Sequence, residues 1–321
     1  MKNNILIAPG GSGMAISAIK ALKQDKNIRI VSIDSDKLSP GLYLSHKGYI
    51  VPAFEDNKFI PAIEKIIKKE KINLIIPALD TILLRFSELK LFFKEKGADV
   101  LVSEQETIKI TRDKWKTYNK LKDIIPFPKS FIEKDKTDAM FPLFIKPREG
   151  SGSQNVYKVD SKEDMDFYYK KIKNPIIQEY LSGKEHTVDC LADNKNKLVL
   201  IICRERIETK AGISTKGKIV KNKKIEDMAV KISESLKFYG PFFFQTKEDR
   251  NRNPKLTEIN ARISGTMSLS SFAGPNIHIL SAKISRGEKI KKTKIKYGTY
   301  VTRYLEDIYL TEQKIKKIHE I

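Results

Sequence analysis

The segment KLTEINARI (255–263) carries three polar side chains at alternate positions, Glu258, Asn260 and Arg262. Alternate residues of a β-strand project from the same face, so these side chains would lie side by side. Gln245 lies on the preceding apolar run, across what the turn RNRNP predicts to be a β-hairpin. Carboxylate and amide oxygens grouped in this way suit Mg²⁺, which keeps waters or phosphates in its remaining positions, and Arg262 would face an anion held by the metal. A solvent-facing polar stripe is the weaker alternative.

A lysine and a glycine-serine loop follow one another in FPLFIKPREGSGSQNVYKV (141–159). Lys146 ends an apolar strand, and backbone N–H groups of the following loop could bind phosphate oxygens, to which the lysine would add a point charge. The loop joins two strands rather than a strand and a helix, which excludes a Walker A loop. On its own the segment is more typical of an ordinary hairpin with a lysine whose stem lies along apolar surface. The loop residues are Gly150, Ser151, Gly152 and Ser153.

Two further segments place polar groups beside strands. In 176–191 an apolar strand runs into Gln178-Glu179-Tyr180-Leu181, and Glu185 follows a turn. Such a segment could present backbone groups to a purine and a carboxylate to ribose hydroxyls, and a solvated loop explains it equally well. In 203–217, Arg204 and Arg206 share a strand face before a loop rich in glycine, serine, threonine and lysine. A mobile lid over an anionic substrate and a basic surface loop are both open interpretations.

The elements that must position these residues fall into two parts. Over the first 105 residues apolar runs alternate with amphipathic helical patterns, which predicts a doubly wound parallel sheet. The turn Gly10-Gly11-Ser12-Gly13 after the first strand invites comparison with the G-x-G-x-x-G dinucleotide fingerprint, but Ile16 stands at the third position. Asp34 does lie about 20 residues on, as that fingerprint requires. Because Ile16 does not fit the third glycine position, we nevertheless favour a plain strand-to-helix turn. The remainder of the chain reads as an α+β region.

The composition excludes several classes of protein. Lys+Arg number 61 against 40 Asp+Glu, a net charge of +21, but only 11 are arginines, and the lysines are scattered over amphipathic helices. This favours a solvated surface over a nucleic-acid footprint. No apolar run approaches the roughly 20 residues that cross a bilayer, and the apolar start is too short for a secretory signal. With only Cys190 and Cys203, a disulfide scaffold is excluded, and we expect a cytoplasmic protein.

The order of the motifs is itself informative. After a parallel α/β region come R-D-K-W, F-I-K-P-R-E-G-S-G-S, Q-E-Y-L-S-G-K-E and F-Q…E-I-N-A-R. In this the chain resembles the ATP-grasp superfamily, above all single-copy proteins similar to one synthetase half of the carbamoyl-phosphate synthetase large chain. The resemblance covers nearly the whole chain. It implies a Rossmann-like pre-ATP-grasp domain at 1–108 and an ATP-grasp domain at 109–321, with a small subdomain at 109–180 and a large subdomain at 181–321.

The resemblance also implies an activity. ATP would phosphorylate a small-molecule carboxylate to an acyl phosphate, and an amine or thiol would displace phosphate, with Mg²⁺ or Mn²⁺ as the ion. Positioning and charge neutralisation would carry catalysis, without a nucleophilic side chain. A homodimer is the assembly that the resemblance favours. A complete carbamoyl-phosphate synthetase needs two such halves and an ammonia source, so that activity is not expected of 321 residues.

Family roles carry over to matching positions of this chain. Lys114 and Lys146 match the basic residues on the ATP phosphates, and Gly150 to Ser153 match the flap above those phosphates. Gln178 to Leu181 match the adenine hinge, and Glu185 matches the acid that binds the ribose. Gln245, Glu258 and Asn260 match the Mg²⁺ ligands, and Lys146 and Arg262 match the catalytic residues. Arg204 and Arg206, with Arg262, are candidates for substrate contact.

The chain departs from the family pattern in three places. The flap reads GSGSQNV where related sequences usually have a glycine near Asn155, Asp80-Thr81-Ile82 lacks the second acid often found there, and His46 stands where an aspartate is common. The last two concern the first-domain face of the substrate site. Three other hypotheses stay open beside the ligase: a nicotinamide-dependent dehydrogenase using the N-terminal domain, a nucleic-acid-binding protein that uses the net charge, and a nucleotide-binding protein without catalysis.

Overall fold

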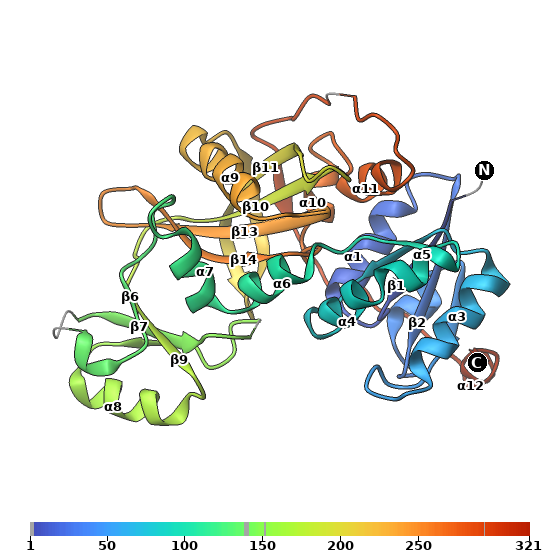
Figure 1. The fold of residues 1–321 in the computed structure, drawn as a ribbon, viewed down its shortest axis with the longest axis horizontal. Coiled ribbons are helices and arrows are strands. Elements are labelled where there is room, and N and C mark those ends of the chain that lie inside the picture. Colours follow the sequence, from blue (N-terminus) through green and yellow to red (C-terminus); the bar gives the residue numbers. More distant parts are fainter. Residues whose placement is uncertain (1–2, 138–140, 151, 292) are drawn as a thin grey trace.

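A computed structural model describes residues 3–137, 141–150, 152–291 and 293–321. Figure 1 shows a parallel α/β part at one end of the molecule and two further sheets, one above the other, at the opposite end. The expected fold class is confirmed: an N-terminal parallel sheet is followed by an α+β region built on antiparallel sheets.

The first sheet has six strands in the order β16-β3-β2-β1-β4-β5, and all its pairings are parallel. Helices lie on both faces, so its strands are continuous apolar runs. The strands are β1 (Asn3–Ala8), β2 (Ile28–Asp34), β3 (Lys47–Ile50), β4 (Leu74–Pro77), β5 (Asp99–Val100) and β16 (His319–Glu320). The helices are α1 (Gly13–Leu22), α2 (Pro40–Leu44), α3 (Phe59–Glu70), the 3-10 turn η1 (Asp80–Ile82), α4 (Leu83–Glu88) and α5 (Lys90–Glu95).

The strand order reverses between β1 and β4, and this switch point is where ligands of open α/β sheets commonly bind. The carboxyl end of β1 carries the glycine turn that begins α1, and the carboxyl end of β4 leads into η1 with Asp80. This edge faces the rest of the chain, because the backbone at Gly265 approaches Gly13 and Met14.

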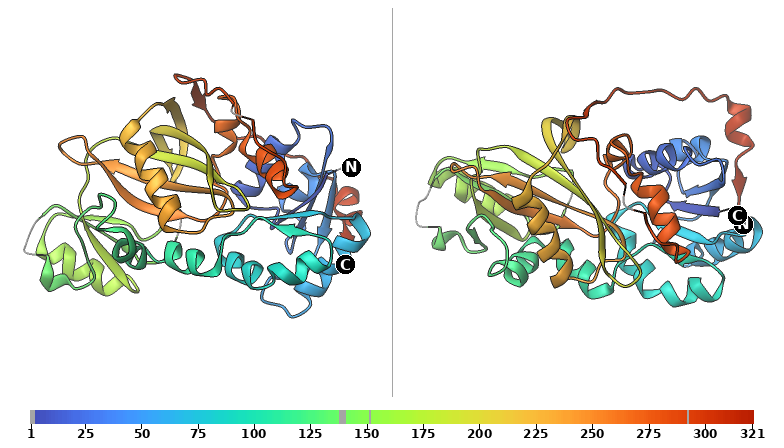
Figure 2. Two further views of the ribbon diagram at one scale, coloured as in Figure 1. Left: turned by 45° about the horizontal axis from the view of Figure 1, so that its top comes forward. Right: turned by 90° about the horizontal axis from the view of Figure 1, so that it is seen from above.

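Two helices connect the first sheet to the others, α6 (Gln105–Arg112) and α7 (Lys114–Leu121). Asp113 separates them and caps α7, since its side chain accepts hydrogen bonds from the backbone N–H groups of Trp115 and Lys116. Figure 2 shows these helices as a bridge along one side of the molecule.

A four-stranded antiparallel sheet follows, in the order β6-β9-β7-β8. Its members are β6 (Ser130–Phe131), β7 (Leu143–Pro147), β8 (Tyr157–Val159) and β9 (Pro175–Glu179), with η2 (Lys134–Lys136) and α8 (Lys162–Lys171). Leu143, Ile145 and Ile177 form a small core with Met165 of α8. Because side chains alternate, Phe144 and Lys146 project from the opposite face.

A six-stranded antiparallel sheet, in the order β14-β13-β10-β11-β12-β15, lies opposite that second face. Its strands are β10 (Glu185–Ala192), β11 (Leu198–Lys210), β12 (Ile213–Val220), β13 (Gly240–Glu248), β14 (Pro254–Asn260) and β15 (Tyr300–Thr302). The remaining helices are α9 (Lys223–Ser235), α10 (Ser268–Ser271), α11 (Ile277–Ser285) and α12 (Glu312–Lys316).

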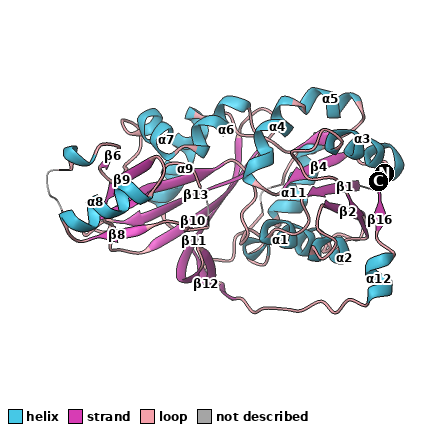
Figure 3. Cartoon of the chain, turned by 90° about the horizontal axis from the view of Figure 1, so that it is seen from below, coloured by secondary structure: helices cyan, strands magenta, loops and turns pink. Residues whose placement is uncertain are grey.

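The C-terminal residues of the chain join the N-terminal sheet. After β15 an extended segment crosses outside the body of the molecule to α12 and β16 (Figures 2 and 3). There His319 pairs with Tyr49 and Glu320 with Ile50 of β3. The last strand therefore belongs to the first sheet and not to the sheets built by the residues just before it.

Two smaller sequence expectations concern the cysteines and the membrane. Cys190 and Cys203 lie on neighbouring strands as buried free thiols. Of the helices in the described ranges, none has the length and apolar character that crossing a bilayer would require.

Candidate active site

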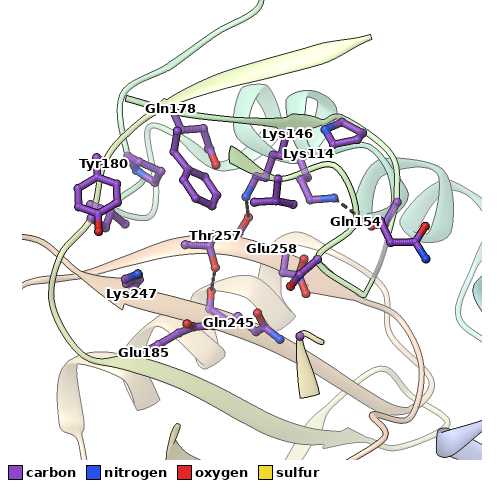
Figure 4. A pocket seen from close by; sticks show the side chains of 18 of the residues that line it. Lys114, Lys146, Gln154, Gln178, Tyr180, Glu185, Gln245, Lys247, Thr257 and Glu258 are labelled. Carbon is purple, nitrogen blue, oxygen red and sulfur yellow. Dashed lines mark hydrogen bonds between the residues drawn. The ribbon is translucent and has the colours of Figure 1, made fainter. Parts of the chain in front are cut away.

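A cavity lies between the four-stranded sheet and the strands β13 and β14 (Figure 4), and it encloses about 1000 Å³ when its open mouth is counted. Most residues that the sequence suggested for nucleotide and metal binding line this single cavity. They are Lys114, Lys146, Gly150, Gly152, Ser153, Gln178, Glu179, Tyr180, Leu181, Glu185, Gln245 and Glu258. Ser151, also predicted, lies outside the described residues.

Lys146 reaches the cavity from β7 and is 8% exposed. Its Nζ lies 3.4 Å from the carbonyl oxygen of Thr257. Burial and, to a smaller extent, the neighbouring charge of Lys114 lower the pKa of this ammonium, Glu258 and Glu185 act in the opposite direction, and the resulting pKa is about 8. Among the described residues no carboxylate pairs with this buried ammonium, so its charge is available to an anion.

Lys114 is the first residue of α7 and faces the same cavity. Its Nζ donates to the carbonyl oxygens of Gly150, at 3.2 Å, and Arg148, at 3.4 Å. Asp113 links the start of α7 to the residue that follows β7. Besides capping α7, it accepts two hydrogen bonds from the Arg148 guanidinium. Although burial alone would raise the pKa of Asp113, the hydrogen bonds from Arg148 and from two backbone N–H groups hold it below its usual value.

The glycine-serine loop closes one side of the cavity. Gly150 and Gly152 adopt φ values of 143° and 70°, which favour glycine. Gly212 approaches this loop so closely that a Cβ at that position would lie 2.6 Å from Ser153 Oγ. Gly212 belongs to the two-residue tip between β11 and β12, so the segment expected to be a loop is a β-hairpin in contact with the flap.

The two arginines of that segment are engaged within the protein. Arg206 pairs with Glu185 at 3.0 Å and donates to the carbonyl oxygen of Gly212. Arg204 is 2% exposed and holds Asp189 through two hydrogen bonds. Neither arginine lines the described cavities, so the expected contact with substrate has no support in their placement.

The three proposed metal ligands lie close together on the hairpin formed by β13 and β14. Gln245 and Glu258 are cross-strand partners, and Asn260 Nδ2 donates to Glu258 Oε1 at 3.1 Å. Within the described ranges no group of three or more His, Cys, Asp or Glu residues could hold a metal ion. One carboxylate with amide oxygens, beside two lysines, fits Mg²⁺ that takes its remaining ligands from phosphates and water.

A second cavity adjoins the first at the carboxyl edge of the N-terminal sheet. Asp80 and Thr81 line it from the first sheet, and Asn260 from β14. Lys114, Gly150 and Glu258 line both cavities, so these residues stand where the two spaces meet.

Arg262 does not itself line a described cavity, but its chain neighbours Asn260 and Ala261 and its partner Asp80 line the second one. Its Nε and Nη2 donate to the two carboxylate oxygens of Asp80 at 2.5 and 2.6 Å. The ring of Phe243 lies 5.2 Å from the guanidinium carbon. The residue proposed as catalytic therefore has a partner from the first domain.

Several lining residues escaped the sequence analysis, among them Pro128, Phe144, Lys247 and Thr257. Two of them carried a usable signal: Phe144 stands two residues before Lys146, and Lys247 two residues after Gln245, so each shares a strand face with a predicted residue.

Near the glycine turn of the N-terminal domain, the acid that a dinucleotide would need, Asp34, is hydrogen-bonded to the neighbouring backbone. Asp34 Oδ2 accepts from the backbone N–H of Gly11 at 2.7 Å, and Oδ1 from that of Asp36 at 3.1 Å. The backbone of α2 presses on the turn, since a Cβ on Gly41 would lie 2.2 Å from the carbonyl oxygen of Gly10. This favours the structural interpretation of the turn over the dehydrogenase hypothesis.

A parallel α/β domain followed by two antiparallel sheets with a lysine-bearing cavity between them is the architecture of ATP-grasp proteins. Family models match accordingly: "PylC-like, N-terminal domain" over residues 5–101, and "ATP-grasp in the biosynthetic pathway with Ter operon" over residues 171–307. The chain thus carries a PylC-like N-terminal domain and an ATP-grasp domain.

Relatives agree with this assignment. The carbamoyl phosphate synthase large chain of Clostridium perfringens is 27% identical over 318 residues, which cover 89% of this chain and 28% of the relative. A carbamoyl-phosphate synthase of Methanobrevibacter smithii is 22% identical over 77% of this chain and 71% of its own length. The chain thus spans little more than a quarter of the large chains that it matches.

Solved structures share the fold. N5-carboxyaminoimidazole synthetase from Staphylococcus aureus complexed with ADP has a TM-score of 0.76 and 18% identity, over 94% of this chain and 82% of that one. The biotin carboxylase domain dimer of 2-oxoglutarate carboxylase from Hydrogenobacter thermophilus, with MgADP, has a TM-score of 0.74 and 15% identity, over 93% and 73% of the two chains.

Proposed function

We propose that this protein is an ADP-forming ligase that uses ATP and Mg²⁺ to activate a small carboxylate and join it to an amine or thiol. The observation that carries the proposal is the meeting of two cavities at Lys114, Gly150 and Glu258. A nucleotide in the first cavity and an acid in the second would face each other across these residues. The proposed domains are those of the sequence analysis, 1–108 and 109–321 with a division near 180, and a homodimer is the proposed assembly.

The chemistry is a phosphoryl transfer followed by an acyl transfer. A carboxylate oxygen attacks the γ-phosphorus of ATP, the bond to the β-phosphate oxygen breaks, and ADP leaves. The nucleophile then adds to the acyl carbon and loses its proton, and phosphate departs with one of the acid's original oxygens. Both steps gather negative charge on phosphoryl oxygens, so fixed positive charge is the main requirement.

The chain's residues meet that requirement. Lys146 and Lys114 would hold the phosphates, because both ammonium groups face the cavity and neither has a carboxylate partner among the described residues. Glu258, Asn260 and Gln245 would hold Mg²⁺, which when bound neutralises phosphate charge. Arg262 would steady the acyl phosphate from the side of the second cavity.

The nucleotide's base and ribose have separate proposed contacts. The segment from Gln178 to Leu181 would contact the base, and Glu185, oriented by Arg206, the ribose hydroxyls. The flap around Gly150 and Gly152 would cover the phosphates, with the hairpin tip at Gly212 supporting it.

Isotope transfer tests the proposal directly. The purified chain is screened with ATP, Mg²⁺ and pairs of small acids and amines for release of ADP and phosphate. With an active pair, an acid labelled with ¹⁸O in its carboxylate should deliver one ¹⁸O to phosphate. Glu258→Gln should lower the rate of ADP release roughly 10²-fold or more in a folded protein, whereas Glu208→Gln, on the surface hairpin, should leave it unchanged. Unlabelled phosphate, or full turnover by Glu258→Gln, contradicts the proposal.

A further inference from the structure

Arg206 connects two parts of the wall of the first cavity without lining that cavity itself. Its Nη1 lies 3.0 Å from Glu185 Oε1, and its Nη2 donates a hydrogen bond of 2.7 Å to the carbonyl oxygen of Gly212. Glu185 and Gly212 both line the cavity. One guanidinium, in a side chain that is 5% exposed, therefore joins the start of β10 to the tip of the β11–β12 hairpin.

The two contacts of Arg206 fix the orientation of its guanidinium. Its Nε is buried and has no hydrogen-bond partner in the described part of the chain, so no third contact competes with these two. The pairing of β11 with β12 shifts register between Arg206 and Glu208, and such a bulge re-aims the side chains beside it. Because a guanidinium is planar and rigid, a constraint on one of its partners is passed to the other.

The tip of the hairpin lies against the flap, the loop around Gly150 and Gly152. Ala211 and Gly212 form the tip with φ values of 46° and 74°, as in the tight two-residue turns of hairpins. A Cβ on Gly212 would lie 3.1 Å from the carbonyl carbon of Gly152 and 3.2 Å from the backbone nitrogen of Ser153. The tip and the flap are thus in backbone contact, and the position of one restricts that of the other.

These contacts form a continuous connection from Glu185 to the flap. The Glu185 side chain is 31% exposed, and Figure 4 shows it well apart from Gln154, the residue that follows the flap. We propose that Arg206 is a positioning residue that couples the binding of ribose at Glu185 to the ordering of the flap over the phosphates. Ribose hydroxyls that donate to the carboxylate fix it in place, and Arg206 passes this constraint to Gly212. The inference rests on the proposed nucleotide cavity and adds a link between the sugar and the cover of the phosphates.

The reactivity of a cysteine introduced beside the flap measures the ordering of the flap. Gln154→Cys places a thiol at an exposed position, and both native cysteines are buried, so the new thiol is the one that an aromatic disulfide reagent reaches in the folded chain. The reaction rate is measured with Mg²⁺ and saturating ADP, and with Mg²⁺ and saturating dideoxy-ADP, which lacks only the two ribose hydroxyls. ADP should slow the reaction at least about fivefold more, the lower end of typical coupling between two sites.

Arg206→Met, in the Gln154→Cys chain, should remove this difference between the nucleotides. ADP should then slow the reaction no more than dideoxy-ADP does, and calorimetry should show weaker binding of ADP with nearly unchanged binding of dideoxy-ADP. A merely structural role of Arg206 would weaken both ligands alike. Lys216→Met is the matched control, because it breaks an ion pair of 2.8 Å with Glu208 on the same hairpin that does not involve Glu185. The control should keep the difference.

Two results would overturn the inference. One is equal slowing by ADP and dideoxy-ADP in the Gln154→Cys chain that retains Arg206, and the other is a difference that persists in Arg206→Met. Because the first result is decisive without any change at position 206, a misfolded Arg206→Met variant does not rescue the inference.

The inference and the proposed function fail separately. Flap protection that depends on the ribose hydroxyls and on Arg206, in a chain that never turns over, would support the inference and count against the ligase. ADP-forming turnover with equal protection by both nucleotides would support the ligase and overturn the inference. Absence of ADP binding in calorimetry would overturn both.

Discussion

Arg262 and Asp80 form a two-point ion pair between the end of the ATP-grasp sheet and the switch point of the N-terminal sheet, with both guanidinium contacts at 2.5–2.6 Å. Arg262 also donates to the carbonyl oxygen of Ile263. A planar guanidinium bound in this way has a defined orientation, which an arginine in solvent lacks. The proposed catalytic arginine is thus oriented by a different domain from the one that carries it.

This relationship predicts unequal effects at its two ends. Arg262→Lys should lower kcat roughly 10²- to 10³-fold, as loss of a donor to developing charge does, with little change in nucleotide affinity. Asp80→Asn keeps the arginine but loosens it, and should give a smaller fall in kcat with a higher KM for the acid. Steady-state kinetics with an active acid–amine pair measures both. Equal kinetics in wild type and Arg262→Lys would remove Arg262 from the mechanism.

Lys146 should matter for binding as well as for chemistry. Lys146→Met removes the buried charge while keeping most of the side-chain volume, so ATP affinity should fall by roughly 10- to 100-fold, because a charge-assisted hydrogen bond is lost. Lys134→Met removes a surface lysine whose partner is Asp166, outside the cavity, and should leave affinity unchanged. Titration calorimetry compares the three proteins. Similar affinities in all three would place the phosphates elsewhere.

Nucleotide affinity should depend on pH through the same lysine. Burial lowers the pKa of Lys146 to about 8 in the free protein, and a bound phosphate would raise it again. The protonated form is the one that binds, so affinity should be level below about pH 7 and fall as the pH rises through 8, with protons taken up on binding. Titrations at pH 8.5 in buffers of different ionisation enthalpy measure this uptake. Lys146→Met should abolish it, and a proton uptake that persists in that variant would assign the effect to another group.

The dependence of turnover on Mg²⁺ should arise mainly from Glu258. Glu258→Gln removes the only carboxylate of the proposed ligand set, so much more Mg²⁺ should be needed for turnover, and kcat at saturating metal should fall roughly 10²-fold or more. Binding of ADP without metal should change far less. A magnesium titration of ADP release, alongside metal-free calorimetry, separates the two effects. An unchanged magnesium requirement would refute the ligand set.

Asp189 and Arg204 should contribute to stability and not to substrate binding. The pair is buried, and Asp189 also accepts hydrogen bonds from Ser264 and Ser270, on the segment that follows Arg262. Arg204→Met leaves a buried carboxylate without its partner and should cost about 3–5 kcal/mol in urea unfolding. Lys216→Met breaks a surface pair with Glu208 and should cost less than about 1 kcal/mol. A small loss for Arg204→Met, with a raised KM for the acid, would restore the original expectation of substrate contact.

Strand alternation predicted that Glu258 and Asn260 share a face with Gln245 across the hairpin, because alternation is a local property, whereas the presence of Lys146 in the same site was implied only by the family resemblance. Lys146, Glu258 and Gln245 end or flank apolar runs, and hairpin pairing brings the last two together. The alternation of apolar strands and helices likewise predicted the parallel sheet, which the structure confirms.

Local sequence patterns could not predict ion pairs between residues far apart in the chain. The pairs Arg262–Asp80 and Arg204–Asp189 depend on how sheets pack, and a strand pattern does not say whether an arginine will find a carboxylate inside the protein or a ligand in solvent. Residues 83–97 show the same limit, because their apolar spacing is that of a single helix, whereas the chain breaks into α4 and α5 at Leu89. Here tertiary packing decides what periodicity alone leaves open.

The strand β16 has a consequence for biogenesis. The edge of β3 that it covers is synthesised early, whereas β16 emerges from the ribosome only after every strand of the ATP-grasp domain. An uncovered edge strand is a template for pairing with other chains. Until β16 has been synthesised, the outer edge of β3 therefore lacks the strand that covers it in the folded protein.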